Sequence, residues 1–516
     1  MTRYFIACVV AVCALFSGAS ANAVVYNADP SDYQTVLGQL VAGDILELVA
    51  GDYTDVLSIT DMIGTDGNPI IITGPTSGAP AVFLGDSSRN TVSIRRSEYV
   101  TISHLEIDGQ MIANIDAIKA EGDVDNWAHH ITIEYCEITG HDANQQTTGI
   151  STKAPAWNWT IRYNIIHSAG TGMYLGNSDG EAAFIAGLIE YNLIADPEGY
   201  CMQIKHQNPR PTLPDMPDDG ATTIIRHNVF IKDDDPSGSG DRPNVLLGHF
   251  PLSGEGQNDL YAVYGNFFFH NPREALFQGE GNIHLHDNIF VDSANGWPAV
   301  NITAHNDVPR DIAFYNNTIC HADTGISVTG VDVTYDQMVI ANAVFAADPI
   351  SLVTGVLESD NVTDTVSGAA SYVIDATLDL ALLDMYPLPG QLTGGSYETA
   401  LADLTGDPDY DRDFNGTVKD FTYRGAYHGG ESSNPGWHLA EEIKDEVAGS
   451  DTDADSDTDA DTDSDADSDT DVGGTNPTGP TGGTPADEDG CGCSATGRIG
   501  RAGSPLGLIL RLLFPI

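Results

Sequence analysis

Apolar and polar residues alternate in short segments that recur nine times between residues 98 and 346. Each segment has an apolar residue three positions before its central residue and another two positions after it. The segments read TISHLEI, TIEYCEI, TIRYNII, LIEYNLI, IIRHNVF, AVYGNFF, HLHDNIF, AFYNNTI and MVIANAV, with centres 22 to 38 residues apart. Alternation with a period of two predicts short strands. Recurrence at this spacing predicts a β-solenoid, in which each repeat buries its apolar face against its neighbours.

Seven of the nine central positions are asparagines, and the first two are Leu105 and Cys136. An asparagine tolerates the left-handed backbone of a tight bend, and its amide can bond to equivalent residues in the repeats above and below. We therefore expect a ladder of stacked amides at the inter-strand spacing of about 4.8 Å. Its members are Asn164, Asn192, Asn228, Asn266, Asn288, Asn317 and Asn342.

A second strand recurs in each repeat, in DAIKAEG (116–122), GISTK (149–153), GMYLGN (172–177), CMQIKHQ (201–207), NVLLGHF (244–250), ALFQGE (275–280) and AVNITAHN (299–306). If the apolar residues of these strands point inward, alternate residues point outward. The predicted outward residues are Lys119, Ser151, Lys153, Tyr174, Gln203, Lys205, Leu246, Phe277, Asn301 and Thr303. Three of the six lysines of the chain thus fall on one face.

The repeats resemble the right-handed parallel β-helices of the pectate-lyase-like superfamily, over roughly residues 24–430. The resemblance implies an all-β fold, a right-handed parallel β-helix with an N-terminal cap helix. We expect that helix within residues 31–41 and the last strands of the domain within residues 413–430. The resemblance also implies a sugar-binding groove on an outer sheet face. The function of the protein has to be argued from the residues of that groove.

The two termini indicate export. Residues 1–23 have the apolar stretch and the Ala-Asn-Ala cleavage signal of a signal peptide, and the apolar stretch is too short to span a membrane. We expect residues 431–490 to be a linker, because they contain an eleven-aspartate run that has nothing to bury. Residues 491–516 resemble the Cys-containing sorting tail of myxobacterial surface proteins. These features predict a secreted protein anchored at the bacterial cell surface.

The net charge of the chain limits the kinds of molecule that it can bind. The chain has 21 Lys and Arg against 75 Asp and Glu, a formal net charge of −54. Nucleic acid is excluded as a partner because phosphate binding needs a basic surface. An acidic polysaccharide requires cations or a local basic patch. The solenoid has only three cysteines, Cys136, Cys201 and Cys320, which we interpret as buried thiols. We expect a monomer whose partner is a polysaccharide or cell-surface glycan.

Catalysis is predicted at Lys205, His206 and His249. Long segments follow the second strands of consecutive repeats, at residues 206–221, 231–244 and 249–260. Segments of this length in a compact fold are usually functional or disordered. The three segments are expected to wall a cleft. For β-elimination on a uronic acid, Lys205 or His206 is the candidate base and His249 the candidate acid.

The same reaction requires the substrate carboxylate to be neutralised. Arg210 or Ca²⁺ is the candidate for this role, with Glu198 and Glu255 as candidate calcium ligands; no cofactor follows from the sequence with certainty. The full set of predicted substrate-binding residues is Lys119, Lys153, Tyr174, Gln203, Arg210, Phe277, Glu280 and His305.

Three alternatives to a lyase stay open. A glycoside hydrolase is less favoured, because the motifs of the polygalacturonases of this superfamily are incomplete. A glycan-binding protein without turnover would use Tyr174, Phe277 and Trp297 as a stacking platform. A structural or adhesive surface protein would need neither arrangement.

Arg226 is predicted to be structural. By linear spacing, Lys205 and Arg226 resemble the Lys–Arg pair of the alginate-type lyases, but the repeat register places Arg226 on the same turn as Lys205. The position two before each pivot holds Glu134, Arg162, Glu190 and Arg226 in succession. We expect these residues to form an alternating charge ladder.

Overall fold

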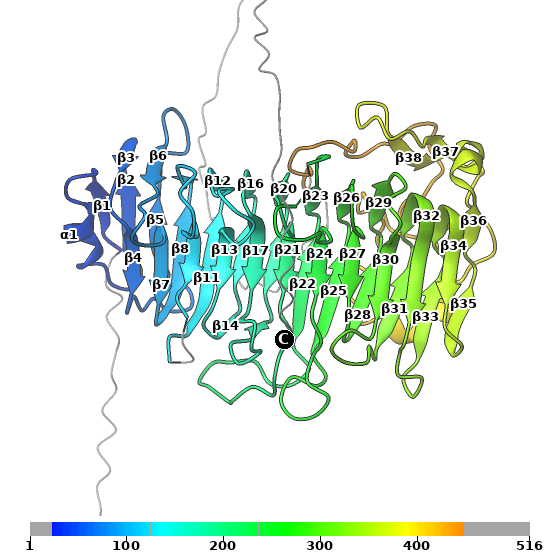
Figure 1. The fold of residues 1–516 in the computed structure, drawn as a ribbon, viewed down its shortest axis with the longest axis horizontal. Helices are drawn as coiled ribbons and strands as arrows, with labels where there is room; N and C mark the ends of the chain where they lie inside the picture. The colour runs from blue at the N-terminus through cyan, green and yellow to red at the C-terminus, as the bar shows by residue number, and fades with distance from the viewer. Residues whose placement is uncertain (1–22, 123–124, 236, 448–516) are drawn as a thin grey trace, which may run out of the picture. The chain divides into compact units, whose positions relative to one another are not determined.

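The computed structural model describes residues 23–122, 125–235 and 237–447, which form a right-handed parallel β-helix (Figure 1). Each turn contributes a strand to three parallel columns. The first column contains β1 (Val25–Ala28), β2 (Ile45–Leu48), β5 (Ile70–Thr73), β8 (Ser97–Ser103), β11 (Ala128–Glu134), β15 (Thr160–Arg162), β19 (Leu188–Glu190), β22 (Thr222–Arg226), β25 (Leu260–Tyr264), β28 (Ile283–His286), β31 (Ile312–Tyr315), β33 (Gln337–Ile340) and β35 (Val356–Ser359). Two short strands, β14 (Ala156–Trp157) and β18 (Phe184–Ile185), extend it.

The second column begins directly after the asparagine pivots. It contains β3 (Gly51–Tyr53), β6 (Ala81–Leu84), β9 (Leu105–Asp108), β12 (Glu137–Thr139), β16 (Ile165–His167), β20 (Leu193–Ala195), β23 (Val229–Ile231), β26 (Phe267–Phe269), β29 (Ile289–Asp292), β32 (Thr318–Thr329), β34 (Ala343–Leu352) and β36 (Val362–Asp364).

The third column carries the predicted outward residues. It contains β4 (Leu57–Thr60), β7 (Val92–Arg95), β10 (Ile118–Ala120), β13 (Thr148–Thr152), β17 (Thr171–Leu175), β21 (Met202–Ile204), β24 (Val245–Leu247), β27 (Phe277–Gly279) and β30 (Pro298–Thr303). The long strands β32 and β34 span both the second and the third column.

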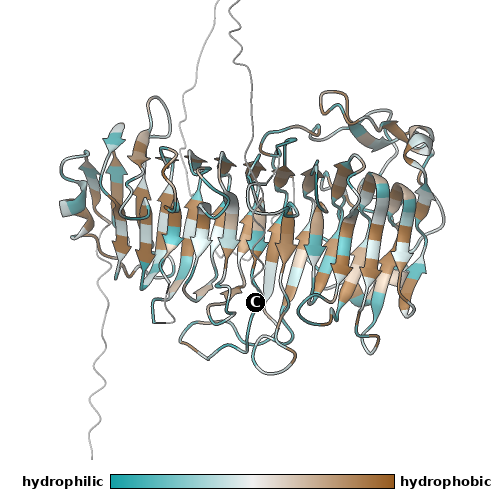
Figure 2. Ribbon diagram, viewed as in Figure 1, coloured by the Kyte–Doolittle hydropathy of each residue, from teal (hydrophilic) through white to brown (hydrophobic). Residues whose placement is uncertain are grey.

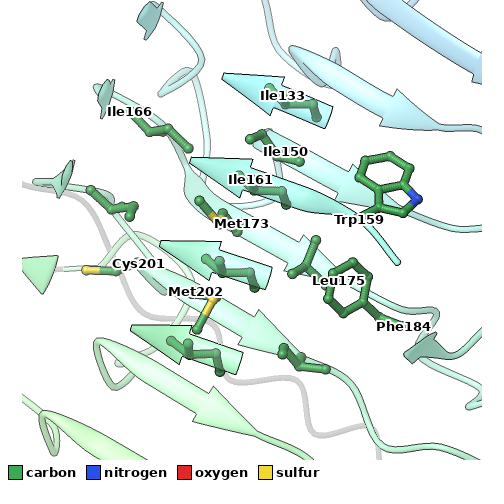
Figure 3. Close-up of a cluster of buried hydrophobic side chains, with 14 of the residues drawn as sticks. Ile133, Ile150, Trp159, Ile161, Ile166, Met173, Leu175, Phe184, Cys201 and Met202 are labelled. Atoms are coloured by element: carbon green, nitrogen blue, oxygen red, sulfur yellow. The ribbon is translucent and has the colours of Figure 1, made fainter. Parts of the chain in front are cut away.

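Alternation along the strands builds the core. Apolar and polar bands alternate in Figure 2, and the inward side chains of successive turns stack on one another. Figure 3 shows Ile133, Ile161 and Met173 in this interior, with Trp159 and Phe184 at one corner. Burial of each such side chain contributes about 1.5–3 kcal/mol, so the fold draws its stability from many similar contacts.

The asparagine ladder is present and is longer than the sequence pattern indicated. The side-chain amide of Asn228 donates to Asn266 Oδ1 at 3.0 Å, and the same contact repeats from Asn164 to Asn342. It continues to Asn361, between β35 and β36. One expectation was wrong: the left-handed backbone belongs to the residue before each asparagine, such as Tyr163 with φ 54°. The asparagine side chain points inward and forms hydrogen bonds with the next asparagine of the ladder and with backbone carbonyl groups.

The N-terminal end is covered as predicted. Helix α1 (Tyr33–Leu37) is shorter than the expected 31–41 segment, and it buries Tyr33 and Leu37 against the first turn. The Tyr33 ring meets the rings of Tyr53 and Phe83 at 5.1 and 5.8 Å between centroids. These contacts cover apolar surface that the first turn would otherwise expose.

The C-terminal end differs from expectation, because the parallel strands stop at Asp364. The following chain forms a 3₁₀ turn η1 (Val366–Ser371), an antiparallel pair β37 (Val373–Asp375) and β38 (Asp384–Pro387), and a second 3₁₀ turn η2 (Glu398–Leu404). The chain then packs on the outside of the helix. Asp407 and Phe421 contact the first column, whereas Trp437 and Leu439 lie against the second column, along which the orange trace in Figure 1 runs back. Residues 413–430 are therefore not the last strands of the helix.

Part of the expected linker also packs on the helix. Trp437 lies in an apolar cluster with Phe267 and Phe414, and the Lys444 ammonium donates to the Gly265 carbonyl at 3.0 Å. Residues 431–447 thus belong to the packed structure, because they bury apolar area that a spacer lacks.

The remaining sequence predictions about the ends of the chain fall on residues that the structure does not describe. These are the signal peptide up to residue 22, the aspartate run and the Cys-containing tail. Within the described ranges, no helix is long and apolar enough to cross a membrane. The three solenoid cysteines, Cys136, Cys201 and Cys320, are free and buried, as predicted.

Candidate functional site

A cleft of about 560 Å³ lies on the outer face of the third column. Its floor is built from strands β10, β13, β17 and β21, and its walls from the connections around them. Lining residues are Asn114, Asp116, Lys119, Gln145, Gln146, Thr148, Lys153, Thr171, Tyr174, Asn177, Ser178, Tyr200, Gln203, Lys205 and Arg242. Five predicted site residues meet here: Lys119, Lys153, Tyr174, Gln203 and Lys205.

Strand register explains why these side chains meet. Lys119 pairs with Ser151, Ser151 with Tyr174, and Tyr174 with Gln203 in adjacent parallel strands. Parallel strands in register place equivalent side chains about 4.8 Å apart on the same face. The outward row of the third column therefore forms the floor of the cleft.

Two lysines approach the Tyr174 ring at the centre of the floor. The Lys153 ammonium lies 3.2 Å from the ring centroid, and the Lys205 ammonium lies 5.7 Å from it. Burial is the main cause that lowers the pKa of Lys153, to about 7, and nearby lysines add to the effect. Burial also lowers the pKa of Lys205. Neutral amine is thus accessible at physiological pH for at least one of them.

Lys119 and Arg242 complete the cationic lining. The Lys119 ammonium pairs with the Asp116 carboxylate at 2.9 Å. Arg242 comes from the connection between β23 and β24, and its guanidinium lies 5.7 Å from the Tyr200 ring centroid. Asp116 and Arg242 were not among the predicted site residues, since they lie on connections rather than in the repeating strands.

The electrostatic contrast with the rest of the chain is large. Four cationic side chains line the cleft, with Asp116 as the one lining carboxylate, in a chain of net charge −54. Where these groups are charged, partial burial reduces the screening of their charge by water. The cleft is therefore suited to an anionic ligand, and its polar lining to a polyhydroxylated one.

His206 and His249 lie outside the cleft lining. Their rings stack on each other with centroids 5.2 Å apart, and His249 Nδ1 faces the Phe250 carbonyl oxygen at 3.2 Å. Burial is the main cause that lowers the pKa of His206, and the neighbouring imidazole adds to it. Of the three predicted catalytic residues, only Lys205 lines the cleft, and the two histidines contact each other.

Phe277 points inward, contrary to prediction. It is fully buried in the core and packs edge-on against Phe268 at 6.2 Å between ring centroids. Register pairs Leu246 with Gln278, so Gln278 occupies the outward position of this turn. The predicted stacking platform therefore loses Phe277. Trp297 is 39% exposed, but it lies outside the cleft lining.

Arg210 has a structural role instead of the predicted substrate contact. Its guanidinium is buried and bonds to the Asp259 carboxylate and to the carbonyl oxygens of Pro217 and Asp218. Asp259 in turn accepts the backbone N–H groups of Gly220 and Ala221. The pair ties two long connections together.

Replacement of Arg210 by alanine should destabilise the protein without altering the cleft. Removing one partner of a buried ion pair costs about 3–5 kcal/mol, because the remaining charge stays buried. We expect Arg210→Ala to lower the thermal midpoint while the activity per folded molecule stays unchanged. If Arg210→Ala kept the thermal midpoint of wild type but lost activity, Arg210 would contact the substrate as the sequence predicted.

Glu280 and His305 form part of a turn. The Glu280 carboxylate accepts the backbone N–H groups of His305, Asn306 and Asp307, at 2.9–3.3 Å. It also accepts the Asn306 side-chain amide at 2.9 Å. Neither Glu280 nor His305 lines the cleft, and the Glu280 oxygens are occupied by these bonds.

The candidate calcium ligands do not meet in the cleft either. Glu255 is exposed, and neither Glu198 nor Glu255 lines the cleft. Across the described residues, no three His, Cys, Asp or Glu side chains gather in a way that could hold a metal ion. The residues proposed for calcium thus do not form a preassembled site in this structure.

The three long connections were all expected to wall the cleft, and the structure does not place them all there. Only the 231–244 connection reaches the cleft, through Arg242. The 206–221 and 249–260 connections are joined by the Arg210–Asp259 pair, and Leu213 packs near Trp157 on the first column. The cleft is therefore walled mainly by the shorter connections that precede β10, β13 and β21.

Arg226 is part of the predicted charge ladder. Its guanidinium pairs with Glu190 at 2.7 Å, and Arg162 pairs with Glu134 at 2.8 Å. The Tyr264 hydroxyl lies 3.2 Å from Arg226 Nη1. This side chain is buried by stacked neighbours on the first column and has no contact with the cleft lining.

No protein-family model matches this chain, and no curated protein matches it. Among solved structures, the PL6 family alginate lyase AlyGC is similar at 15% identity over 66% of this chain, with a TM-score of 0.35. The match spans 51% of that enzyme, about half its length. The GH136 lacto-N-biosidase from Eubacterium ramulus is similar at 11% identity over 66% of this chain and 68% of that chain, with a TM-score of 0.43.

The Azotobacter vinelandii mannuronan C-5 epimerase AlgE4 A-module is similar at 15% identity, over 68% of this chain and 94% of that chain, with a TM-score of 0.40. At these identities the likeness is one of fold. The roles of residues in this chain therefore rest on the cleft itself.

Proposed function

We propose that this protein is a secreted, surface-displayed enzyme that cleaves an acidic polysaccharide by β-elimination in the cleft of the third column. The observation that carries the proposal is that Lys119, Lys153, Lys205 and Arg242 line one cleft in a chain that is otherwise strongly acidic, with the Lys153 and Lys205 ammonium groups against the Tyr174 ring. Polyuronates are long, anionic and polyhydroxylated, and they match the charge and the polar lining of this cleft.

The first requirement of β-elimination is stabilisation of the substrate carboxylate. Lys205 and Arg242 are on the side of Tyr174 away from Lys153 in strand order, and both are half-buried. We assign them to the uronate carboxylate, because fixed positive charge lowers the energy of the carbanion-like state that follows loss of the C5 proton. Lys119 is already paired with Asp116 and is assigned to a neighbouring sugar.

The second requirement is a base, and we assign it to Lys153. A general base works best when its pKa is near the working pH, and burial brings the pKa of Lys153 to about 7. The neutral amine takes the C5 proton. The C5–H electrons form the C4–C5 double bond as the C4–O bond breaks, and the Lys153 ammonium later returns its proton to solvent.

The third requirement is an acid for the leaving oxygen, and we assign it to Tyr174. Burial raises the pKa of its hydroxyl, so the group stays protonated at neutral pH. The hydroxyl gives its proton to the C4 oxygen as the bond breaks, and the phenolate recovers a proton from solvent. This assignment replaces His249, which lies outside the cleft lining.

The assignment of Lys153 sets the pH dependence. The base acts in its neutral form, so kcat should rise as pH increases through about 7. Below that pH the ammonium adds positive charge to the cleft, so KM for the polyanion should fall as kcat falls. Steady-state kinetics between pH 5.5 and 8.5, at roughly constant ionic strength, measure both. A kcat that falls as pH rises through this range would contradict a lysine base.

The function is tested by incubating the protein with uronate-containing and neutral polysaccharides, with calcium or with chelator. Unsaturated uronate is read by ultraviolet absorbance and chain cleavage by reducing ends. We expect both signals from an acidic polymer, in equal amounts, and neither from a neutral one. Reducing ends without unsaturated product would mean hydrolysis, and would overturn the elimination mechanism.

Binding without turnover is the second candidate function. The observation in its favour is the pair of aromatic residues, Tyr174 and Tyr200, that line the cleft beside the cations. Aromatic faces and fixed charges suffice for recognition. Retention of the protein on an acidic polysaccharide gel, together with silence in both product assays, would favour this function over the lyase.

A further inference from the structure

A second, smaller pocket lies on the outer side of the first column, on residues that the proposed reaction does not use. It measures about 130 Å³ and is lined by Glu98, Trp127, His129, Trp157, Leu213, Pro214 and Asp215. Glu98 lies in β8, His129 in β11 and Trp157 in β14. The 206–221 connection supplies the remaining wall. None of these residues lines the cationic cleft.

The pocket wall is a cluster of aromatic rings. The His129 ring stacks on both Trp127 and Trp157, with centroid distances of 5.0 and 4.3 Å and interplanar angles of 24° and 20°. The two tryptophan centroids are 6.4 Å apart, so the three rings form a compact triangle and not a single column. Trp157 is buried in a cluster with Ala183 and Ile185, apart from the solenoid core, and Leu213 and Pro214 add aliphatic surface to the pocket lining.

A chain of hydrogen bonds fixes the protons of this site. The Asn158 side-chain amide donates to His130 Nε2 at 2.9 Å, so the proton of neutral His130 is on Nδ1. That atom donates to His129 Nδ1 at 2.8 Å, which leaves the His129 proton on Nε2. His129 Nε2 donates to the Glu98 carboxylate at 2.8 Å. Glu98 is therefore oriented by a neutral imidazole, while burial and then the nearby Asp215 carboxylate raise the pKa of its carboxyl.

The charges around the pocket have one sign. Glu98 and Asp215 are its charged lining residues, and the set of lining residues in the described chain includes no Lys or Arg. Burial lowers the pKa of His129 to about 4, so this ring adds no positive charge at neutral pH. A small space lined by aromatic rings, Leu213, Pro214 and two carboxylates complements a cation that also carries methyl groups.

We propose that this pocket binds an alkylated ammonium group of the choline or methylamine type. The methyl groups contact Trp127, Leu213 and Pro214, and the positive charge faces Glu98 and Asp215. Aromatic faces attract such cations, most strongly where water is excluded. The site gives the protein a second recognition surface, independent of the polysaccharide cleft and of opposite charge preference.

The test is titration of the folded full-length protein with choline chloride, followed by tryptophan fluorescence and by calorimetry. The neutral tert-butyl isostere of choline and methyl glucoside are titrated in parallel. We expect choline to bind and the isostere to bind at least about tenfold more weakly, because only the charge differs. Equal binding of the isostere, preferred binding of the sugar, or absence of choline binding would each overturn the proposal.

Variants locate the binding to this pocket. Glu98→Gln keeps an acceptor for His129 and removes the charge, and Trp127→Leu removes one aromatic face. Each should weaken choline binding by about tenfold while the thermal midpoint stays close to that of wild type. Glu358→Gln, at an exposed position of β35, is the matched control and should bind choline normally. Unchanged binding in Glu98→Gln with a normal midpoint would place the cation elsewhere.

Discussion

Replacement of Lys153 by methionine should reduce cleavage of an acidic polysaccharide by about 10³-fold, the range expected for loss of a general base. Methionine keeps most of the volume of the lysine stem but can take no proton. The side chain lies on the outer face against the Tyr174 ring, so the solenoid core is unaffected. Initial rates of unsaturated product, measured above pH 8, give the size of the effect.

The arginine variant separates charge from proton transfer. Lys153→Arg keeps the positive charge, but a guanidinium stays protonated and cannot act as a base. We expect it to bind the polysaccharide nearly as well as wild type and to cleave as poorly as the methionine variant. Arg89→Ala, which removes an exposed cation paired with Asp55, is the control and should cleave normally. Substantial turnover by Lys153→Arg would remove Lys153 from the role of base.

Replacement of Asn228 by alanine should destabilise the folded state by about 3–6 kcal/mol. Asn228 is fully buried; its amide nitrogen donates to Ile189 O, Arg226 O and Asn266 Oδ1, and its oxygen accepts from Asn192. Each buried polar group left without a partner costs about 1–3 kcal/mol, and alanine orphans several at once. Chemical denaturation monitored by circular dichroism measures the loss.

The end of the ladder offers a matched control for this variant. Asn361 makes the same kind of contact with Asn342, but it lies on the last turn and is only half-buried. Water can replace its bonds, so Asn361→Ala should cost clearly less than Asn228→Ala. If the two variants lost the same free energy of unfolding, burial between turns would not be the reason why the ladder amides stabilise the fold.

Much of the fold follows from local pattern. The spacing of apolar residues around Asn164, Asn192 and Asn228 fixes the inward and outward faces, and the alternation of Glu190 with Arg226 fixes the register of neighbouring turns. The C-terminal return segment could not be predicted in this way. Its contacts, such as Lys419 with Asp287 at 2.6 Å, join residues far apart in the sequence and follow no repeat.

The candidate site could be predicted only where it lies on the repeat. Lys119, Tyr174 and Gln203 meet because strand register places them in one row. Phe277 was predicted to point outward because its segment, ALFQGE, has two apolar residues before the strand. The predicted alternation was therefore one residue out of step with the actual strand register, in which Gln278 pairs with Leu246. A shift of one residue exchanges the two faces of a strand.

Side chains on connections were the other source of error. Arg242, His206 and His249 all follow or precede strands by a few residues, and the path of an irregular connection is set by tertiary contacts. Arg210 illustrates the difficulty: in the sequence it is a cation near Lys205, yet its buried bond to Asp259 holds it on another side of the solenoid. Only the three-dimensional path separates these roles.

The most direct test compares one polyuronate with the same polymer after chemical reduction of its carboxylates to alcohols. The two substrates share chain length and linkage. Reduction converts each carboxylate to a neutral CH2OH group, which removes both the charge and the carbonyl that acidifies the C5–H bond. The lysine-lined cleft and β-elimination predict unsaturated product from the native polymer and none from the reduced one. Cleavage of the reduced polymer at a comparable rate would contradict both the role of the cationic cleft and the elimination mechanism.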